Sequence, residues 1–92
     1  MLLLPATVTV HEANDTLQML TQALRREDGA RLVVDAGGLT QFDSSVLAVL
    51  LECARQVVAA GKRFEVLHLP PKLRALAALY GVAELLPEAV VQ

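Results

Sequence analysis

Residues 31–61 read RLVVDAGGLTQFDSSVLAVLLECARQVVAAG and predict a strand, a turn and a helix in that order. The run at 31–35 is aliphatic and β-branched, which is typical of a central strand buried on both faces. Gly37-Gly38 predicts the turn that ends the strand. From Ser45 to Ala60 nearly every residue is a good helix former, and Gly61 follows as a stop signal.

The flanking segments continue the alternation of strand and helix. Residues 1–4 are apolar and end at Pro5, so they predict one short strand. Thr9 and Glu12 have the spacing of a capping box, which predicts a helix that ends near Asp28-Gly29. Residues 64–69 predict a third strand, and Pro70-Pro71 opens a last helix that closes at Gly81.

This order predicts a small α/β fold formed by residues 1–92 as a single domain. We expect a mainly parallel sheet of three to four strands, packed by three to four helices. A chain of 92 residues builds one core, and 54% hydrophobic residues with only 3% aromatics make that core aliphatic.

Composition also restricts the partners and the location. A net charge of −2 argues against a nucleic-acid partner, because phosphate binding needs a basic surface. The longest apolar run, 46–51, is far shorter than the roughly 20 residues of a membrane span, and the first residues lack the features of a signal peptide. Cys53 is the only cysteine, so an internal disulfide is excluded. We therefore expect a soluble, cytoplasmic protein.

No pattern in the sequence indicates catalysis. His11 and His68 lie far apart without a ligand-spaced cluster, so no metal site is expected. Gly37-Gly38 lacks the further glycines and the lysine of a phosphate-binding loop, and no cofactor is expected either. The chain is predicted not to be an enzyme.

Asp43-Ser44-Ser45 is the most informative loop, because loops after strands in α/β folds lie at the edge of the sheet that binds ligands. One interpretation is that these residues only cap the following helix. The other is protein docking, since that helix has more apolar surface than one sheet requires. Its apolar residues are Val46, Leu47, Val49, Leu50, Leu51, Cys53, Ala54, Val57 and Val58.

The segments Leu32-Val33-Val34-Asp35 and Phe42-Asp43-Ser44-Ser45-Val46-Leu47-Ala48-Val49-Leu50 resemble the signature of STAS domains. This family includes anti-sigma factor antagonists and the C-terminal domains of sulfate transporters. Residues 76–82 and 84–87 are most similar to the MlaB-type subunit of a phospholipid-trafficking ABC transporter.

The resemblance implies two functions for the same turn. In the antagonists the serine at the position of Ser44 is phosphorylated by a partner kinase, and MlaB-type proteins use a threonine there to contact the ATPase. The first expectation is a non-enzymatic accessory subunit that binds the ATPase and reaches the inner membrane only through the transporter. The alternative is an anti-sigma factor antagonist regulated at Ser44. The residues expected to form the partner-binding or phosphorylation site are Asp43, Ser44, Ser45, Val46, Leu47 and Tyr80.

The sequence departs from the family at two places. Val46 stands where the antagonists commonly have glycine, which would crowd a kinase. Only one short strand is expected before the first helix, where the family has an additional one, so we expect a smaller sheet with an open or covered edge. Tyr80 is expected to cover the core with its ring or to contact a partner. A third possibility is a homodimer formed through the apolar helix.

Overall fold

The computed structural model describes residues 1–89 and contains the predicted parallel sheet. Its strands are β1 (Leu2–Leu3), β3 (Arg31–Asp35) and β5 (Arg63–Leu67), in the order β1-β3-β5. All pairs are parallel, with Leu2 opposite Val34 and Val34 opposite Val66. The prediction of a small α/β fold with a central strand at 31–35 is confirmed.

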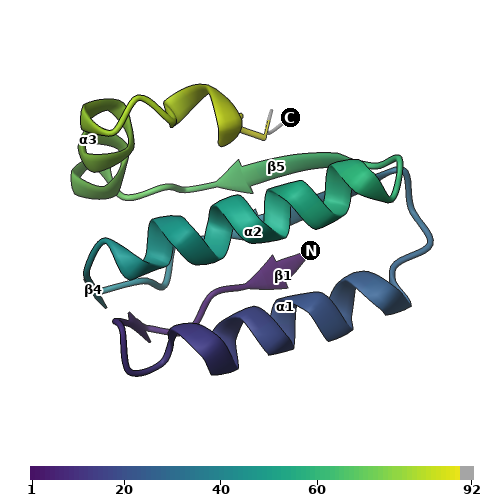
Figure 1. Cartoon of the computed structure of the whole chain (residues 1–92), viewed down its shortest axis with the longest axis horizontal. Helices are drawn as coiled ribbons and strands as arrows, with labels where there is room; N and C mark the ends of the chain where they lie inside the picture. Colours follow the sequence, from purple (N-terminus) through teal and green to yellow (C-terminus); the bar gives the residue numbers. More distant parts are fainter. Residues whose placement is uncertain (90–92) are drawn as a thin grey trace.

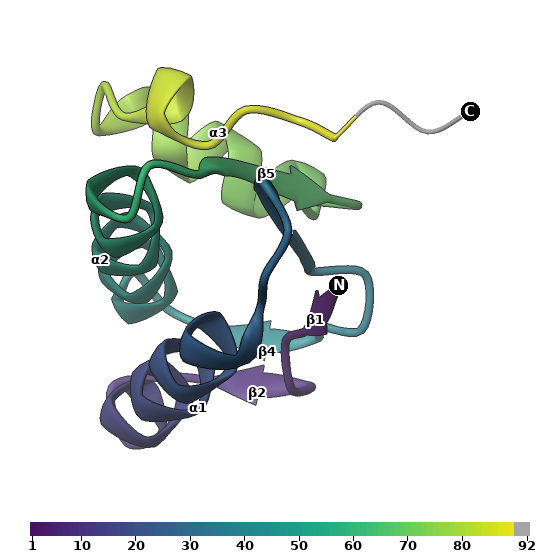
Figure 2. The same ribbon diagram turned by 90° about the vertical axis from the view of Figure 1, so that its right-hand side faces the viewer.

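Helices α1 (Ala13–Arg26) and α2 (Ser45–Ala59) lie side by side on one face of this sheet (Figures 1 and 2). Helix α3 (Pro71–Leu79) and the short 3-10 helix η1 (Ala83–Leu85) follow β5. The core between the layers is aliphatic, as expected. Its fully buried side chains include Leu20 of α1, Leu32 and Val34 of β3, Leu50 of α2 and Val66 of β5.

The expectation that β3 is buried on both faces is wrong. Leu32 and Val34 are buried, whereas Val33 and Asp35 on the other side are only partly buried. Because successive side chains of a strand point to opposite faces, the helices cover only the face that carries Leu32 and Val34. An aliphatic run of this composition does not reveal that one of its faces stays half open.

The expectation of a single strand before the first helix is also wrong. A second strand, β2 (Thr7–Val8), pairs in parallel with β4 (Gln41–Phe42), with Thr7 opposite Gln41 and Val8 opposite Phe42. Two residues are too short to show the alternation by which a strand is recognised in sequence. This small second sheet ends directly before Asp43, so it sets the position of the loop that precedes α2.

The capping box before α1 is only half formed. The Glu12 carboxylate accepts hydrogen bonds from the Thr9 amide at 2.9 Å and from the Thr9 hydroxyl at 2.6 Å. The Thr9 hydroxyl in turn accepts from the His11 amide at 3.3 Å instead of capping a helical amide. Residues 9–12 therefore form a turn, and the helix begins at Ala13.

Strand β5 ends two residues earlier than predicted, at Leu67, because His68 adopts a left-handed backbone conformation with φ of 57°. Its outer edge is covered by the C-terminal segment. The Val66 amide donates to the Pro87 carbonyl and the Ala89 amide donates to the Val66 carbonyl, each at 2.8 Å. Residues 87–89 thus occupy hydrogen-bonding groups that an edge strand would otherwise expose.

Candidate functional site

Asp43 holds the predicted site together. Its Oδ1 accepts a hydrogen bond from the Ser45 amide at 2.8 Å, which caps the first turn of α2. Its Oδ2 accepts from the Val10 amide at 3.1 Å, which ties the turn at 9–12 to the same carboxylate. The sequence predicted the first bond as one possibility. The second joins residues 33 positions apart and was not predicted.

The same hydrogen bonds lower the pKa of the Asp43 carboxyl group. The Ser45 amide lowers the pKa of this carboxyl group most strongly, and Val10 and His11 lower it further. The group is therefore ionised at neutral pH. A negative charge beside the first turn of a helix is also favourable for the helix dipole.

Ser44 directly precedes α2 as its N-cap residue and has helical backbone angles, but its side chain does not cap the helix. The hydroxyl makes no hydrogen bond to any of residues 1–89, and the residue is exposed. The interpretation that all three loop residues serve only as caps therefore fails at Ser44. Because the Asp43 carboxylate already caps the first turn of α2, the Ser44 hydroxyl is free to contact solvent or a partner protein.

Beside Ser44 lies a shallow apolar depression of about 270 Å³, which we call the Ser44 depression. It is lined by Ser44, Leu47, Ala48, Leu51, Tyr80 and Val82. Tyr80 comes from the end of α3, so the fold brings it close to a turn that lies 36 residues earlier in the chain. With 59% of its surface exposed, Tyr80 does not cover the core, and that prediction is wrong.

Two of the predicted contact residues have their side chains inside the protein. Val46 is fully buried, and Leu47 is only 4% exposed at the floor of the Ser44 depression. Val46 therefore supports the first turn of α2 from within. For the same reason its side chain does not stand between Ser44 and an approaching kinase, contrary to the expectation from sequence.

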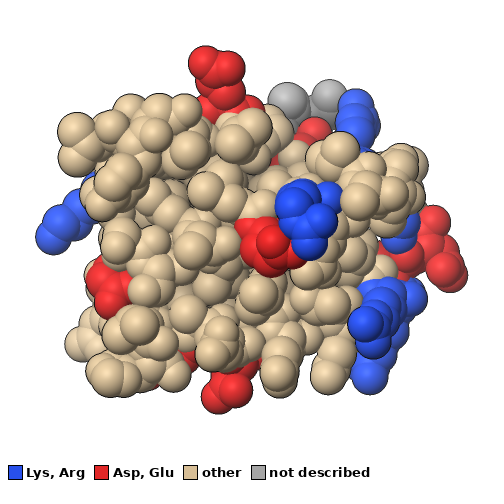
Figure 3. All heavy atoms as spheres, viewed as in Figure 1, with Lys and Arg blue, Asp and Glu red and all other residues tan. Residues whose placement is uncertain are grey.

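Most of the apolar surface of α2 is buried within the domain. Seven of its residues pack into the core, because the helix contacts both β5 and α1. The outward stripe is narrower and contains Ala48, Leu51 and Val58, of which Val58 is 65% exposed. This face of the molecule carries few charged side chains away from its margins (Figure 3).

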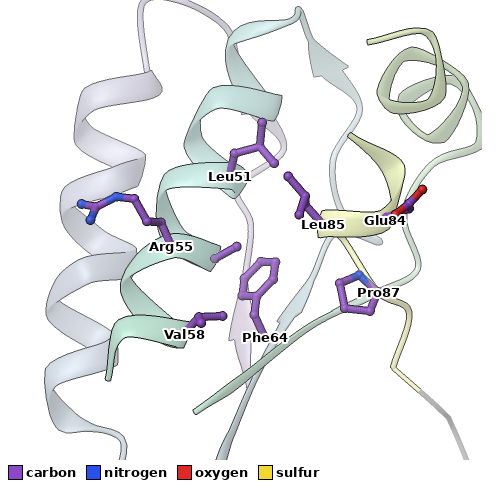
Figure 4. A pocket seen from close by; sticks show the side chains of 8 residues that line it. Leu51, Arg55, Val58, Phe64, Glu84, Leu85 and Pro87 are labelled. Atoms are coloured by element: carbon purple, nitrogen blue, oxygen red, sulfur yellow. The ribbon is translucent and has the colours of Figure 1, made fainter. Parts of the chain in front are cut away.

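A larger apolar groove of about 480 Å³, which we call the Phe64 groove, continues from the Ser44 depression along α2. The two share Leu51. The lining residues are Leu51, Ala54, Arg55, Val58, Phe64, Glu84, Leu85 and Pro87 (Figure 4). No pattern in the sequence predicts this groove, because its second wall comes from η1 and the residues after it.

The described residues also hold titratable groups outside the predicted site. Among residues 1–89 no three histidine, cysteine or acidic side chains come together in a way that could hold a metal ion. Asp35 accepts from the Gly37 amide at 2.8 Å and lies 3.2 Å from His68 Nδ1, and these contacts lower the pKa of its carboxyl group. Burial raises the pKa of the Cys53 thiol to about 11, so the thiol is protonated and unreactive at neutral pH.

No helix in the described part of the chain is long and apolar enough to cross a membrane.

The role of Asp43 can be tested by substitution. Asp43→Ala removes both acceptors, so amide hydrogen exchange at Val10 and Ser45 is expected to become roughly tenfold faster or more. Asp43→Asn retains one good acceptor and should have a smaller effect. Exchange measured residue by residue by NMR would check this. Asp28→Ala, at an exposed aspartate outside the turn, should leave both amides unchanged, and equal protection in all variants would contradict the role of Asp43.

Known proteins share the fold of this chain. A family model described as "Mlab, STAS domain" matches residues 4–87. A STAS domain protein from Planctomyces limnophilus, described as an anti-sigma-factor antagonist, superposes with a TM-score of 0.76 at 14% identity, covering 92% of this chain and 74% of that one. The anti-sigma factor antagonist SpoIIAA in its unphosphorylated form gives 0.73 at 18% identity, covering 96% and 76%. No curated protein matches the chain.

These similarities define the class as a small parallel α/β domain with helices packed on one face of its sheet. The chain belongs to the STAS domain family. Domains of this family are generally regulatory or accessory modules that interact with partner proteins.

Proposed function

We propose that this domain is a non-enzymatic accessory subunit that binds the ATPase of a phospholipid-transport ABC transporter. The contact is made by the turn at Asp43-Ser44 and the first half of α2. In this role the domain stays on the cytoplasmic side of the inner membrane and reaches it only through the transporter. The observation that carries the proposal is the exposed Ser44 hydroxyl, which is free of hydrogen bonds to residues 1–89 and lies beside an apolar depression.

Three features support this surface. The Ser44 depression offers apolar contact at Leu51 and Val82, and Tyr80 adds an exposed aromatic ring with a hydroxyl group. Tyrosines of this kind are common at the centres of interfaces. The match to a family model described as "Mlab, STAS domain" favours a transporter subunit as the partner.

A second candidate function is that of an anti-sigma factor antagonist whose Ser44 is phosphorylated. It is favoured by the position of the hydroxyl at the start of a helix, where the helix dipole stabilises a phosphate group. Asp43 works against it, because the ionised carboxylate would repel the new charge of about −1.5 to −2. A phosphate group on Ser44 would place this negative charge within the contact surface, so phosphorylation would act by weakening partner binding.

The test is a binding measurement with the ATPase subunit of a phospholipid-transport ABC transporter from the same organism. Ser44→Glu puts a carboxylate at the centre of the contact and is expected to weaken binding by about tenfold or more. Gln22→Glu is the matched control, since it adds the same charge at an exposed position of α1. Unchanged binding by Ser44→Glu would contradict the proposed site.

The two functions can be separated in the same preparation. Incubation with a candidate serine kinase, followed by mass spectrometry, would report phosphate on Ser44. Binding of the ATPase without phosphorylation supports the transporter subunit, whereas phosphorylation without ATPase binding supports the antagonist.

A further inference from the structure

The Phe64 groove, at about 480 Å³, is larger than the Ser44 depression, and the proposed function uses only Leu51 at its end. One wall is α2 with Leu51 and Val58, and the opposite wall is formed by Leu85 and Pro87 (Figure 4). Val58 and Leu85 are 65% and 57% exposed. The groove therefore offers a cavity between its walls and an exposed aliphatic side chain on each wall, so it can both receive an apolar side chain and insert one.

Two opposite charges flank the groove on its outer sides. Arg55 extends from α2 away from the groove, and Glu84 extends from η1 away from it on the other side (Figure 4). Glu84 has no ion-pair partner within residues 1–89. Arg55 is held by Glu52, with Nε at 3.0 and 3.1 Å from the two carboxylate oxygens, and its Nη1 takes no part in that pair.

We propose that the Phe64 groove is covered by a second copy of this chain, related by a twofold axis that runs along the groove. With such an axis, the α2 wall of each protomer faces the wall formed by Leu85 and Pro87 of the other protomer. Leu85 of one protomer then packs between Leu51 and Val58 of its partner, and Arg55 of each protomer faces Glu84 of the other. Arg55 lies with Glu52 on one side and Glu84 lies on the other, and Arg55 Nη1, which takes no part in the pair with Glu52, is the donor that makes the surface complementary to itself.

This arrangement favours a second copy over an unrelated protein. Both the apolar contact and the charge pairing are satisfied by residues already present on the chain. Because the two charge pairs lie at the exposed margin of the contact, they are weakened by salt, whereas the apolar contact is not. Self-association is therefore expected to be strongest at low ionic strength.

The first experiment measures molar mass by light scattering or sedimentation over a range of protein concentrations. The wild type is expected to shift from monomer to dimer as concentration rises, and Leu85→Glu to remain monomeric. Circular dichroism would verify that the variant is folded. A wild-type protein that stays monomeric up to millimolar concentration, or a dimer unaffected by Leu85→Glu, would overturn the proposal.

The second experiment tests the symmetry. Arg55→Glu and Glu84→Arg should each weaken self-association by roughly tenfold, because each homodimer then contains two like-charged pairs. An equimolar mixture of the two variants should recover association, since both pairs become attractive in the heterodimer. This recovery cannot come from a folding defect, which mixing would not repair. Failure of the mixture to recover would show that another occupant or another arrangement covers the groove.

The dimer and the proposed ATPase contact can fail separately. Ser44→Glu lies outside the Phe64 groove and should leave self-association unchanged. Loss of the dimer in Leu85→Glu with retained ATPase binding would leave the proposed function standing.

Discussion

Leu50→Ala is expected to lower the free energy of unfolding by about 2–5 kcal/mol, the usual cost of truncating a fully buried leucine. Leu50 has no exposed surface and lies in the middle of α2, where the helix packs on the sheet. A domain of this size has a total stability of about 5–15 kcal/mol, so one substitution removes a large part of it. Chemical denaturation monitored by circular dichroism measures the change.

The neighbouring residue provides a matched control. Leu51→Ala makes the same chemical change one position further along α2, but Leu51 is only partly buried and lines the Ser44 depression and the Phe64 groove. Its cost to folding should be about 1 kcal/mol or less. Partner binding should be more affected than stability. Similar destabilisation by both variants would mean that the outward stripe of α2 belongs to the core.

Acid is expected to destabilise the fold through four carboxyl groups, those of Glu12, Asp35, Asp43 and Glu52. The pKa of each is lowered by hydrogen bonds in the folded protein. Hydrogen bonding and charge from Arg55, with help from Gln56, lower the pKa of Glu52 from 4.5 to about 2. The unfolded chain therefore binds more protons in acid, and stability declines as the pH falls from about 4.5 toward 2.

The midpoint of urea unfolding, compared at neutral pH and at about pH 3, measures this effect. The midpoint should fall at low pH, and Arg55→Gln should reduce the fall because it removes the main cause of the Glu52 shift. High salt should also reduce it, since these groups are exposed and screened. A midpoint independent of pH over this range would contradict the role of the four carboxylates.

The sequence was sufficient for those parts of the fold that show a strong local pattern. The five residues of β3 and the 15 residues of α2 were predicted within one residue at each end, because composition and stop signals agree there. Strands β2 and β4 were missed, since each has two residues and exists only through pairing with the other. The end of β5 was missed because the backbone conformation of His68 is not specified by its residue type.

The residues of the candidate site were easier to predict from the sequence than their arrangement in space. Asp43 and Ser44 were identified from their place before a helix, and the structure divides their roles between capping and exposure. The bond to Val10 and the position of Tyr80 depend on how distant segments pack, which no local pattern encodes. The apparent excess of apolar residues on α2 was overestimated, because the sequence did not reveal that α1 packs beside this helix.

The two hydrogen bonds of the Asp43 carboxylate affect both the affinity and the kinetics of partner binding, because they fix the turn. Each of its oxygens is engaged with a different amide, so the turn that presents Ser44 is fixed before any encounter. A rigid turn loses little conformational entropy on complex formation, and the free energy of the contacts is then available as affinity. Association should accordingly follow a single kinetic phase, without a slow step of loop ordering.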